Sequence, residues 1–169
     1  LEFTSRTTAG SYGYIATFNR ISGTHNRLEY QVYHQLKTGD GYRDNSGFIQ
    51  HQGFAQLGYH INEKQHIRLE YTHMSYLAQQ PGGLTDAQFE ENPVQSIRER
   101  NWFNVNWNVL ALHYDWEISH STRFNVRTFG MLSERMSLGF LGTINKADPG
   151  GQRELVQGEF QNAGGEARL

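Results

Sequence analysis

The sequence predicts an all-β protein, an antiparallel meander that forms part of a large transmembrane β-barrel. One observation is that polar and apolar residues alternate along extended segments. The other is that the connections between these segments are short and long by turns. Short turns are expected at residues 22–26, 62–65 and 117–122, and longer connections at 37–47, 79–101 and 137–153. A sheet that crosses a membrane sorts its turns in this way, whereas a soluble sandwich has no strong reason to do so.

The composition fits a sheet with one lipid-facing side and one wet side. The 18 Gly, 3 Trp, 9 Tyr and 10 Phe favour strands and turns. Only 37% of the 169 residues are hydrophobic, and the mean hydropathy is −0.69. This is a low apolar content for a sheet that is covered by a core on both faces. The charged residues are spread along the chain and sum to a net charge of −2, so the sequence predicts no basic surface for binding nucleic acid. The absence of cysteine excludes a disulfide framework and a thiolate metal site.

Alternation with a period of two residues predicts the individual strands. Within residues 27–37, the apolar-set positions Leu28, Tyr30, Val32, His34 and Leu36 alternate with polar and charged residues. Residues 48–61 and 66–72 repeat the pattern and form a hairpin across 62–65. Seven strands are expected, at residues 2–9, 12–21, 27–36, 48–60, 66–78, 102–116 and 123–136, with an eighth near 155–160. Because residues 158–169 read as another strand being entered, we expect an open part of a larger barrel and not a closed eight-stranded one.

One predicted strand, at residues 102–116, changes phase along its length. Its apolar positions are first Phe103, Val105, Trp107 and Val109, and then the phase shifts to begin again at Leu110. A β-bulge near Val109 would restore one continuous face. Alternatively, the strand leaves the bilayer at this level and its outer half obeys a different pattern. In either case Tyr114 and Trp116 lie beside a short turn, where an aromatic girdle is expected.

The sequence predicts no catalytic residue, no resident cofactor and no metal site. The histidines are scattered, and no pair of them has the spacing of a local metal-binding motif. The serines and histidines have no nucleophile-elbow context. The acidic pairs Asp40 with Asp44 and Glu90 with Glu91 are expected in loops. We therefore do not expect an enzyme.

Three segments of the chain resemble TonB-dependent outer-membrane receptors. These are KTGDGYRDNS at 37–46, EYTHMSYLAQQPGGLTD at 70–86 and SIRERNWF at 96–103, and QPGGLTD at 80–86 is the most specific of them. The similarity is nearest to the branch of ferric citrate receptors and their Bacteroidetes relatives. It implies a plug domain inside a barrel of about 22 strands. Residues 1–169 would be a fragment of that barrel domain, with the plug domain, the TonB box and the C-terminal strands absent from it.

The resemblance also implies a function and partners. The parent protein would lie in the outer membrane of a Gram-negative cell, contact outer-membrane lipid, and import a ferric chelate such as ferric citrate or a similar siderophore. TonB would act through the N-terminal region of the parent. The alternative hypothesis is a stand-alone small outer-membrane barrel, or a surface binding or adhesion module, that does not transport.

Loop side chains are the candidate ligand contacts. Arg43 is expected in one long connection, and Arg98 and Arg100 in the next, together with Gln95. Ferric citrate and related chelates carry carboxylates, which planar guanidinium groups bind through paired hydrogen bonds. The competing interpretation is that Arg98 and Arg100 belong to a solvated loop base.

Overall fold

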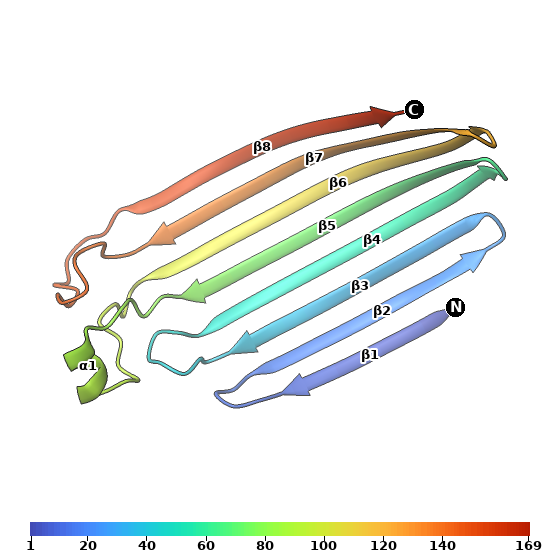
Figure 1. Ribbon diagram of the computed structural model, residues 1–169. Helices are drawn as coiled ribbons and strands as arrows, with labels where there is room; N and C mark the ends of the chain where they lie inside the picture. Colours follow the sequence, from blue (N-terminus) through green and yellow to red (C-terminus); the bar gives the residue numbers. More distant parts are fainter.

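The computed structural model describes residues 1–169, and its eight strands form one antiparallel sheet in which every strand pairs with its sequence neighbour (Figure 1). A six-residue helix, α1 (Asp86–Glu91), lies between β5 and β6. The strands are β1 (Glu2–Ala9), β2 (Ile15–His25), β3 (Leu28–Gly39), β4 (Phe48–Asn62), β5 (Gln65–Gln79), β6 (Trp102–Ser119), β7 (Thr122–Leu138) and β8 (Leu155–Arg168). The predicted antiparallel meander is confirmed.

Except for the short β1–β2 turn at 10–14, which lies with the long loops, short and long connections lie at opposite ends of the sheet (Figure 1). The β2–β3, β4–β5 and β6–β7 turns share the right-hand end in Figure 1, and the longer connections share the left-hand end with α1. This is the predicted sorting. We call these ends the short-turn end and the long-loop end. The helix of this chain lacks the length and hydropathy of a membrane-spanning segment.

The first short turn lies later in the sequence than predicted. Strand β2 continues to His25, so the turn is not at 22–26 but at Asn26, which has a φ of 53°. Gly23 lies inside the strand and not in a turn, and a Cβ on it would come within 2.6 Å of the Tyr30 hydroxyl oxygen. Glycine in a strand can mark such a close approach. At the other end of β2, Tyr12 and Gly13 have positive φ and belong to the β1–β2 turn.

Of the two alternatives for the phase change near Val109, the β-bulge is wrong. Strand β6 pairs with β5 and with β7 without a register shift at this level, where Val109 faces Thr72 on one side and Met131 on the other. The register shifts only between Glu117 and Ser119, next to the turn. The change of phase therefore occurs within a regularly paired strand.

The eighth strand was predicted too short, because β8 is one strand through Arg168.

Directly paired residues share a face, so the register defines two faces, which we name the Leu57 face and the Phe54 face. Near the short-turn end, the Leu57 face carries an exposed apolar band. It includes Ile21, Val32, Leu57, Leu69, Leu110 and Leu112. Aromatic residues lie on this face closest to the turns, namely Tyr59, Tyr114 and Trp116. The predicted placement of Tyr114 and Trp116 beside a short turn agrees with this register.

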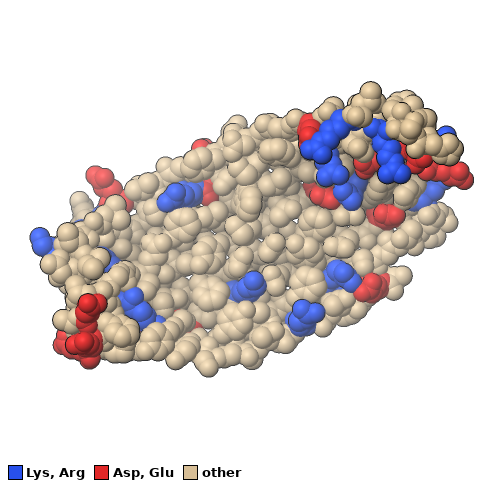
Figure 2. Space-filling view, in the orientation of Figure 1, with Lys and Arg blue, Asp and Glu red and all other residues tan.

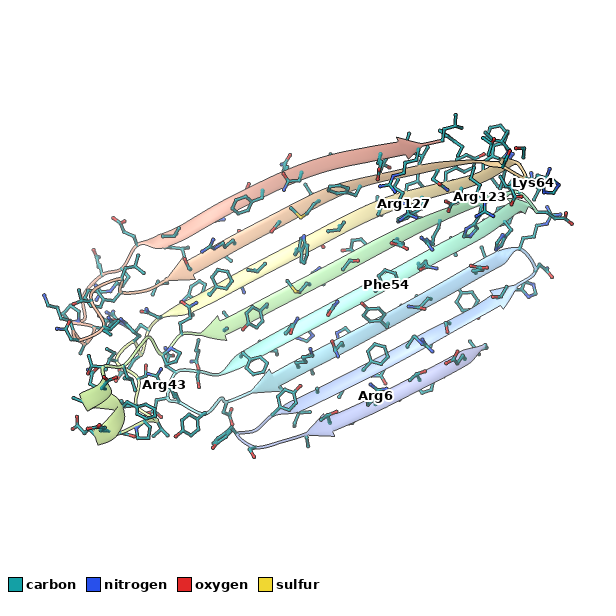
Figure 3. All side chains as sticks on the ribbon, in the orientation of Figure 1. Arg6, Arg43, Phe54, Lys64, Arg123 and Arg127 are labelled. Atoms are coloured by element: carbon teal, nitrogen blue, oxygen red, sulfur yellow. The ribbon has the colours of Figure 1, made fainter.

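The Phe54 face carries different side chains at its two ends. Near the short-turn end it carries ionisable side chains, namely Glu29, Arg68, Glu70, Asp115, Arg127 and Glu166. Figure 2 shows charged groups gathered at this end, and Figure 3 labels Arg123 and Arg127 there. Toward the long-loop end the same face becomes aromatic and apolar, with Phe18, Tyr33, Phe54, Met74 and Trp107. There the Leu57 face carries polar side chains, namely Asn19, His34, His73, Asn106 and Asn108, among exposed apolar ones such as Ile49, Leu77 and Leu132.

The sheet is a single layer without an internal core. Only 5 of 169 residues are buried, and the sole apolar residue with a side chain among them is Ala16. Two of the others, Arg98 and Asn101, lie in the connection between β5 and β6. The best-packed side chains of this chain are therefore in the loops at the long-loop end.

Candidate ligand-binding loops

Three connections meet at the long-loop end: residues 40–47 after β3, residues 80–101 after β5, and residues 139–154 after β7. Backbone hydrogen bonds join them, from Asp44 N to Val94 O (2.8 Å) and from Asp148 N to Ile97 O (3.2 Å). All four candidate residues of the sequence analysis lie here. Figure 3 labels Arg43 in this group, beside α1.

Helix α1 was not predicted, although the sequence carries a signal for it. Thr85 is the N-cap, its side chain accepts a hydrogen bond from Gln88 N, and the Gln88 side chain accepts one from Thr85 N. This is a capping box, which satisfies two backbone donors at the start of a helix. Threonine followed by glutamine three residues later was the available signal.

Arg43 and Gln95 are brought together. The Arg43 guanidinium donates to Gln95 O from Nε (3.1 Å) and Nη2 (2.8 Å), and to Gly82 O from Nη1 (2.6 Å). The Gln95 side chain donates to Gln88 O, within α1 (2.6 Å). Both residues thus fix the fold of the 80–101 connection and tie it to the 40–47 connection.

Arg98 joins the 80–101 and 139–154 connections. Its side chain donates to Lys146 O (2.5 Å), Gly142 O (3.0 Å) and Thr143 O (2.9 Å). Its guanidinium carbon lies 4.8 Å from the centre of the Phe140 ring. Arg98 is only 4% exposed, so its role in this structure is to hold the loops together.

Arg100 differs from the other two arginines because its main partner is a carboxylate. It contacts Asp148 through Nη2 (2.8 and 3.0 Å) and Nε (3.2 Å), and its side chain is 42% exposed. Hydrogen bonding from Arg100, then from Gly150 N and from Arg153, lowers the pKa of Asp148 from 3.8 to about 2 despite its desolvation. Asp148 is therefore ionised at neutral pH and occupies the Arg100 fork.

Two asparagines that the sequence analysis did not select also organise these loops. Asn45 has a φ of 53° and donates from its side chain to Arg98 O (2.5 Å) and Asn101 O (3.1 Å). Asn101 is buried and bonds Phe140 through both its amide nitrogen and its amide oxygen. No local sequence signal indicates contacts between residues this far apart.

The arrangement offers a small polar opening beside Arg100. A cavity of about 240 Å³ lies between the 80–101 and 139–154 connections and is lined by Ser96, Ile97, Glu99, Arg100, Ala147, Asp148 and Gly150. Among the four candidates, Arg100 is the one that combines exposure with a bound carboxylate. Ligand binding by Arg43, Arg98, Arg100 and Gln95 stays a prediction.

A ladder of aromatic rings lies below the loops on the Phe54 face. Phe18 and Tyr33 have centroids 5.4 Å apart, and Tyr33 and Phe54 are stacked at 5.2 Å. Phe54 is labelled near the middle of the sheet in Figure 3. The ladder connects β2, β3 and β4 on the Phe54 face, and polar residues such as Asn19 and His34 lie on the Leu57 face behind it.

At the short-turn end the structure groups three potential metal ligands, Glu29, His60 and His66. The spacing rules applied to the sequence do not detect this group, because the β4–β5 hairpin places His60 directly opposite His66. The hairpin itself was predicted, so the cross-strand pair was available from its register. The approach of Glu29 from β3 was not.

No protein-family model matches the chain. Among solved structures, the unliganded ferric citrate transporter FecA is similar, with a TM-score of 0.79 and 17% sequence identity. The match covers 96% of this chain and 24% of the FecA chain. An identity this low shows the fold and not the substrate. The chain therefore has the fold of part of the FecA barrel, and it spans about a quarter of the length of the FecA chain.

Proposed function

We propose that this chain is part of an outer-membrane transporter of the TonB-dependent type. The observation that carries the proposal is the match of 96% of the chain to FecA. The apolar band on the Leu57 face supports a lipid-facing surface near the short turns. The ionisable groups on the Phe54 face support a wet interior. In this proposal the long-loop end faces outward and the chain performs no catalysis.

We further propose that the transported ligand is an anionic ferric chelate, with ferric citrate as the first to test. Arg100 already binds a carboxylate through its guanidinium fork in this structure. A carboxylate of the chelate would replace Asp148 at that fork. Arg43, Arg98 and Gln95 would act mainly by holding the loops in the shape that receives the ligand. TonB would supply the energy through other parts of the full-length protein.

Transport is tested by uptake of radiolabelled ferric citrate in cells that produce the full-length protein, with and without a functional TonB. We expect uptake that requires TonB. Uptake of ferric citrate that is equal in both strains would contradict the transporter class. Absence of ferric chelate uptake, together with TonB-dependent uptake of a neutral oligosaccharide, would keep the class and remove the iron assignment.

The ligand contact is tested by binding of ferric citrate to the purified full-length protein. We expect Arg100→Ala to weaken binding at least about tenfold, because a charged hydrogen bond contributes about 1.5 to 3 kcal/mol. Arg6→Ala is the matched control, since Arg6 lies on the Phe54 face of β1, away from the loops. Equal affinity in wild type and Arg100→Ala would remove Arg100 from the ligand site.

A further inference from the structure

We propose that Glu29, His60 and His66 form a binding site for a divalent transition-metal ion of the Zn²⁺ class. The site lies on the Phe54 face next to the short turns, on three adjacent strands. Its ligand atoms all lie within 4.8 Å of one another. The proposal rests on these side chains alone and does not depend on the transported ligand.

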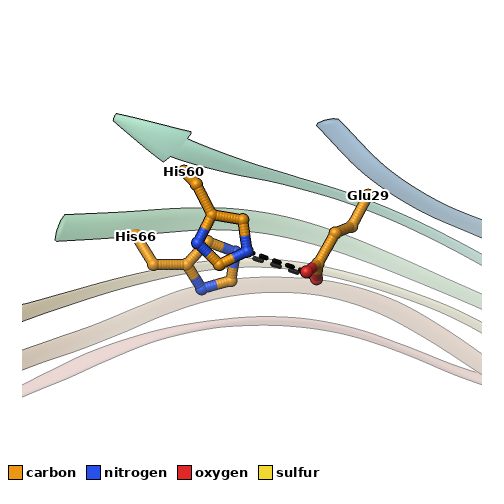
Figure 4. A group of neighbouring side chains, drawn as sticks. All are labelled: Glu29, His60 and His66. Carbon is orange, nitrogen blue, oxygen red and sulfur yellow. Dashed lines mark hydrogen bonds and ion pairs between the residues drawn. The ribbon is translucent and has the colours of Figure 1, made fainter. Parts of the chain in front are cut away.

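The three side chains present the donor atoms that zinc prefers. His60 Nε2 lies 2.8 Å from Glu29 Oε1, and His66 Nε2 lies 4.0 Å from Glu29 Oε2. Figure 4 shows both rings presenting a nitrogen toward the same carboxylate. Ligands about 2.1 Å from a tetrahedral Zn²⁺ lie roughly 3.4 Å from each other. The observed separations bracket this value, so shifts of less than about 1 Å would bring these two contacts to it.

One ring nitrogen of the group has no hydrogen-bond partner in the protein and is free to bind an ion. His66 Nε2 is enclosed and makes no hydrogen bond, although the side chain as a whole is 21% exposed. Buried polar atoms in native proteins nearly always have a partner, which can be an ion. The imidazole rings of His60 and His66 are stacked with centroids 4.3 Å apart and 18° between their planes. Binding requires these rings to tilt so that both lone pairs meet at one point, and the half-exposed His60 has room to do so.

A glycine makes space for the group. Gly58 lies on β4 directly between Glu29 and Arg68 in the register. A Cβ on Gly58 would lie 2.9 Å from His66 Nε2 and 3.5 Å from Glu29 Oε2. The lack of a side chain at this position therefore lets the His66 ring reach toward the carboxylate across β4.

The surrounding charges are compatible with a cation. Arg68 is the nearest competing positive group, and its Nε is 3.0 Å from Glu70 Oε1, which offsets its charge. A cavity of about 310 Å³ borders both histidines and gives a hydrated ion access. Its lining includes the acidic residues Glu63, Asp115 and Glu117 together with Lys64 and Arg123. The site needs one or two water molecules to complete coordination, as in zinc sites with three protein ligands.

The test is calorimetric titration of ZnCl₂ into the untagged, chelator-treated full-length protein in detergent at pH 7.5. We expect one Zn²⁺ per chain at this site. His66→Ala and Glu29→Gln each remove a ligand atom and should weaken binding at least about tenfold. Gly58→Ala keeps all three ligands but crowds His66, and it should also weaken binding at least about tenfold.

Two controls separate this site from nonspecific binding by histidines. Gly53 lies on the same strand as Gly58, and a Cβ at Gly53 would have its nearest neighbour, the His73 Cβ, at 3.9 Å. Gly53→Ala should therefore leave the zinc affinity unchanged. The double variant His34→Asn, His51→Asn removes the other close histidine pair, whose ring nitrogens are 3.4 Å apart, and it should also bind zinc normally.

Three results would overturn the proposal: no zinc binding by the wild type, loss of binding in the His34 and His51 double variant, or wild-type affinity in both Glu29→Gln and Gly58→Ala. The Glu29 and Gly58 variants keep both histidines, so a folding defect in His66→Ala leaves the test intact.

Discussion

The two halves of the sheet expose different side chains, although the same eight strands run through both. Near the short turns the Leu57 face is apolar and the Phe54 face is charged. Toward the long loops the Leu57 face mixes polar residues such as Asn106 and Asn108 with apolar ones, and the Phe54 face is mainly aromatic. Strand β6 shows this most clearly, because its regular register places Trp107 on one face and Leu112 on the other.

In the proposed transporter, the difference arises because each strand meets two solvents along its length. Alternation keeps its period of two in both halves, and only the environment outside the sheet changes. The change falls near the row that contains Tyr33, Phe54 and Val109. In the proposed transporter this row marks the level at which the strands leave the lipid and begin to support the loops.

The largest expected effect comes from a charge placed in the apolar band. Leu112→Arg should destabilise the protein by about 2 to 4 kcal/mol, as arginine does on the lipid face of a membrane barrel near the bilayer midplane. Asn106→Arg is the matched substitution on the same strand and face in the loop half, opposite Glu134, and should cost less than about 1 kcal/mol. The measurement is the free energy of unfolding in phospholipid vesicles from a guanidinium titration. Equal costs for the two variants would contradict the comparison between the halves.

The loop half should depend on Arg98 for local order. Arg98→Ala removes several charged hydrogen bonds to carbonyl groups, each contributing about 1.5 to 3 kcal/mol. We expect proteolytic cleavage within residues 139–154 to accelerate at least about tenfold, while the unfolding of the strands changes little. Arg98→Lys should fall between wild type and alanine, since lysine keeps the charge but lacks the planar fork. Cleavage at the wild-type rate in Arg98→Ala would show that these contacts do not hold the loop.

The same loop should respond to acid through Asp148. Because the pKa of Asp148 is lowered from 3.8 to about 2 in the folded protein, its ionised form stabilises the loop above about pH 4. This contribution decreases as the pH falls and is lost below about 2. Hydrogen exchange in residues 142–151 should therefore accelerate, relative to the strands, between pH 4 and pH 2. Asp148→Asn should lack this relative change, and an identical pH profile in the variant would exclude Asp148 as its cause.

Much of the fold was predictable, because period-two patterning and loop length are local properties of the sequence. These predicted the meander, the common edge of the three short turns and all eight strands, with errors of a few residues at most ends and a larger one at β8, which continues to Arg168. The errors have local causes. Gly23 was interpreted as part of a turn although it lies within β2 and contacts Tyr30. At Val109 the sequence left a bulge and a change of environment as alternatives, and the register excludes the bulge.

The candidate site was less predictable, because its contacts join residues about 40 to 56 positions apart. The sequence indicated arginines in loops, but not that Arg98 would be buried against three carbonyl groups or that Asp148 would occupy Arg100. The His60–His66 pair follows directly from the predicted hairpin. Glu29 joins it only through the longer-range pairing of β3 with β4.

The smallest expected effect tests what the aromatic residues of the loop half contribute. Tyr33 contacts both Phe18 and Phe54, and cross-strand aromatic pairs contribute about 0.2 to 1 kcal/mol each. Tyr33→Leu should therefore lower the free energy of unfolding by about 0.5 to 1.5 kcal/mol. Tyr33→Phe keeps the ring and loses only the 3.3 Å hydrogen bond from Gln52, so its stability should lie close to that of the wild type. If Tyr33→Phe is as unstable as Tyr33→Leu, the hydroxyl group and not the stacked ring is what this position contributes. The Phe54 face would then be stabilised by polar contacts in both halves, and the proposed difference between the halves would hold for the Leu57 face alone.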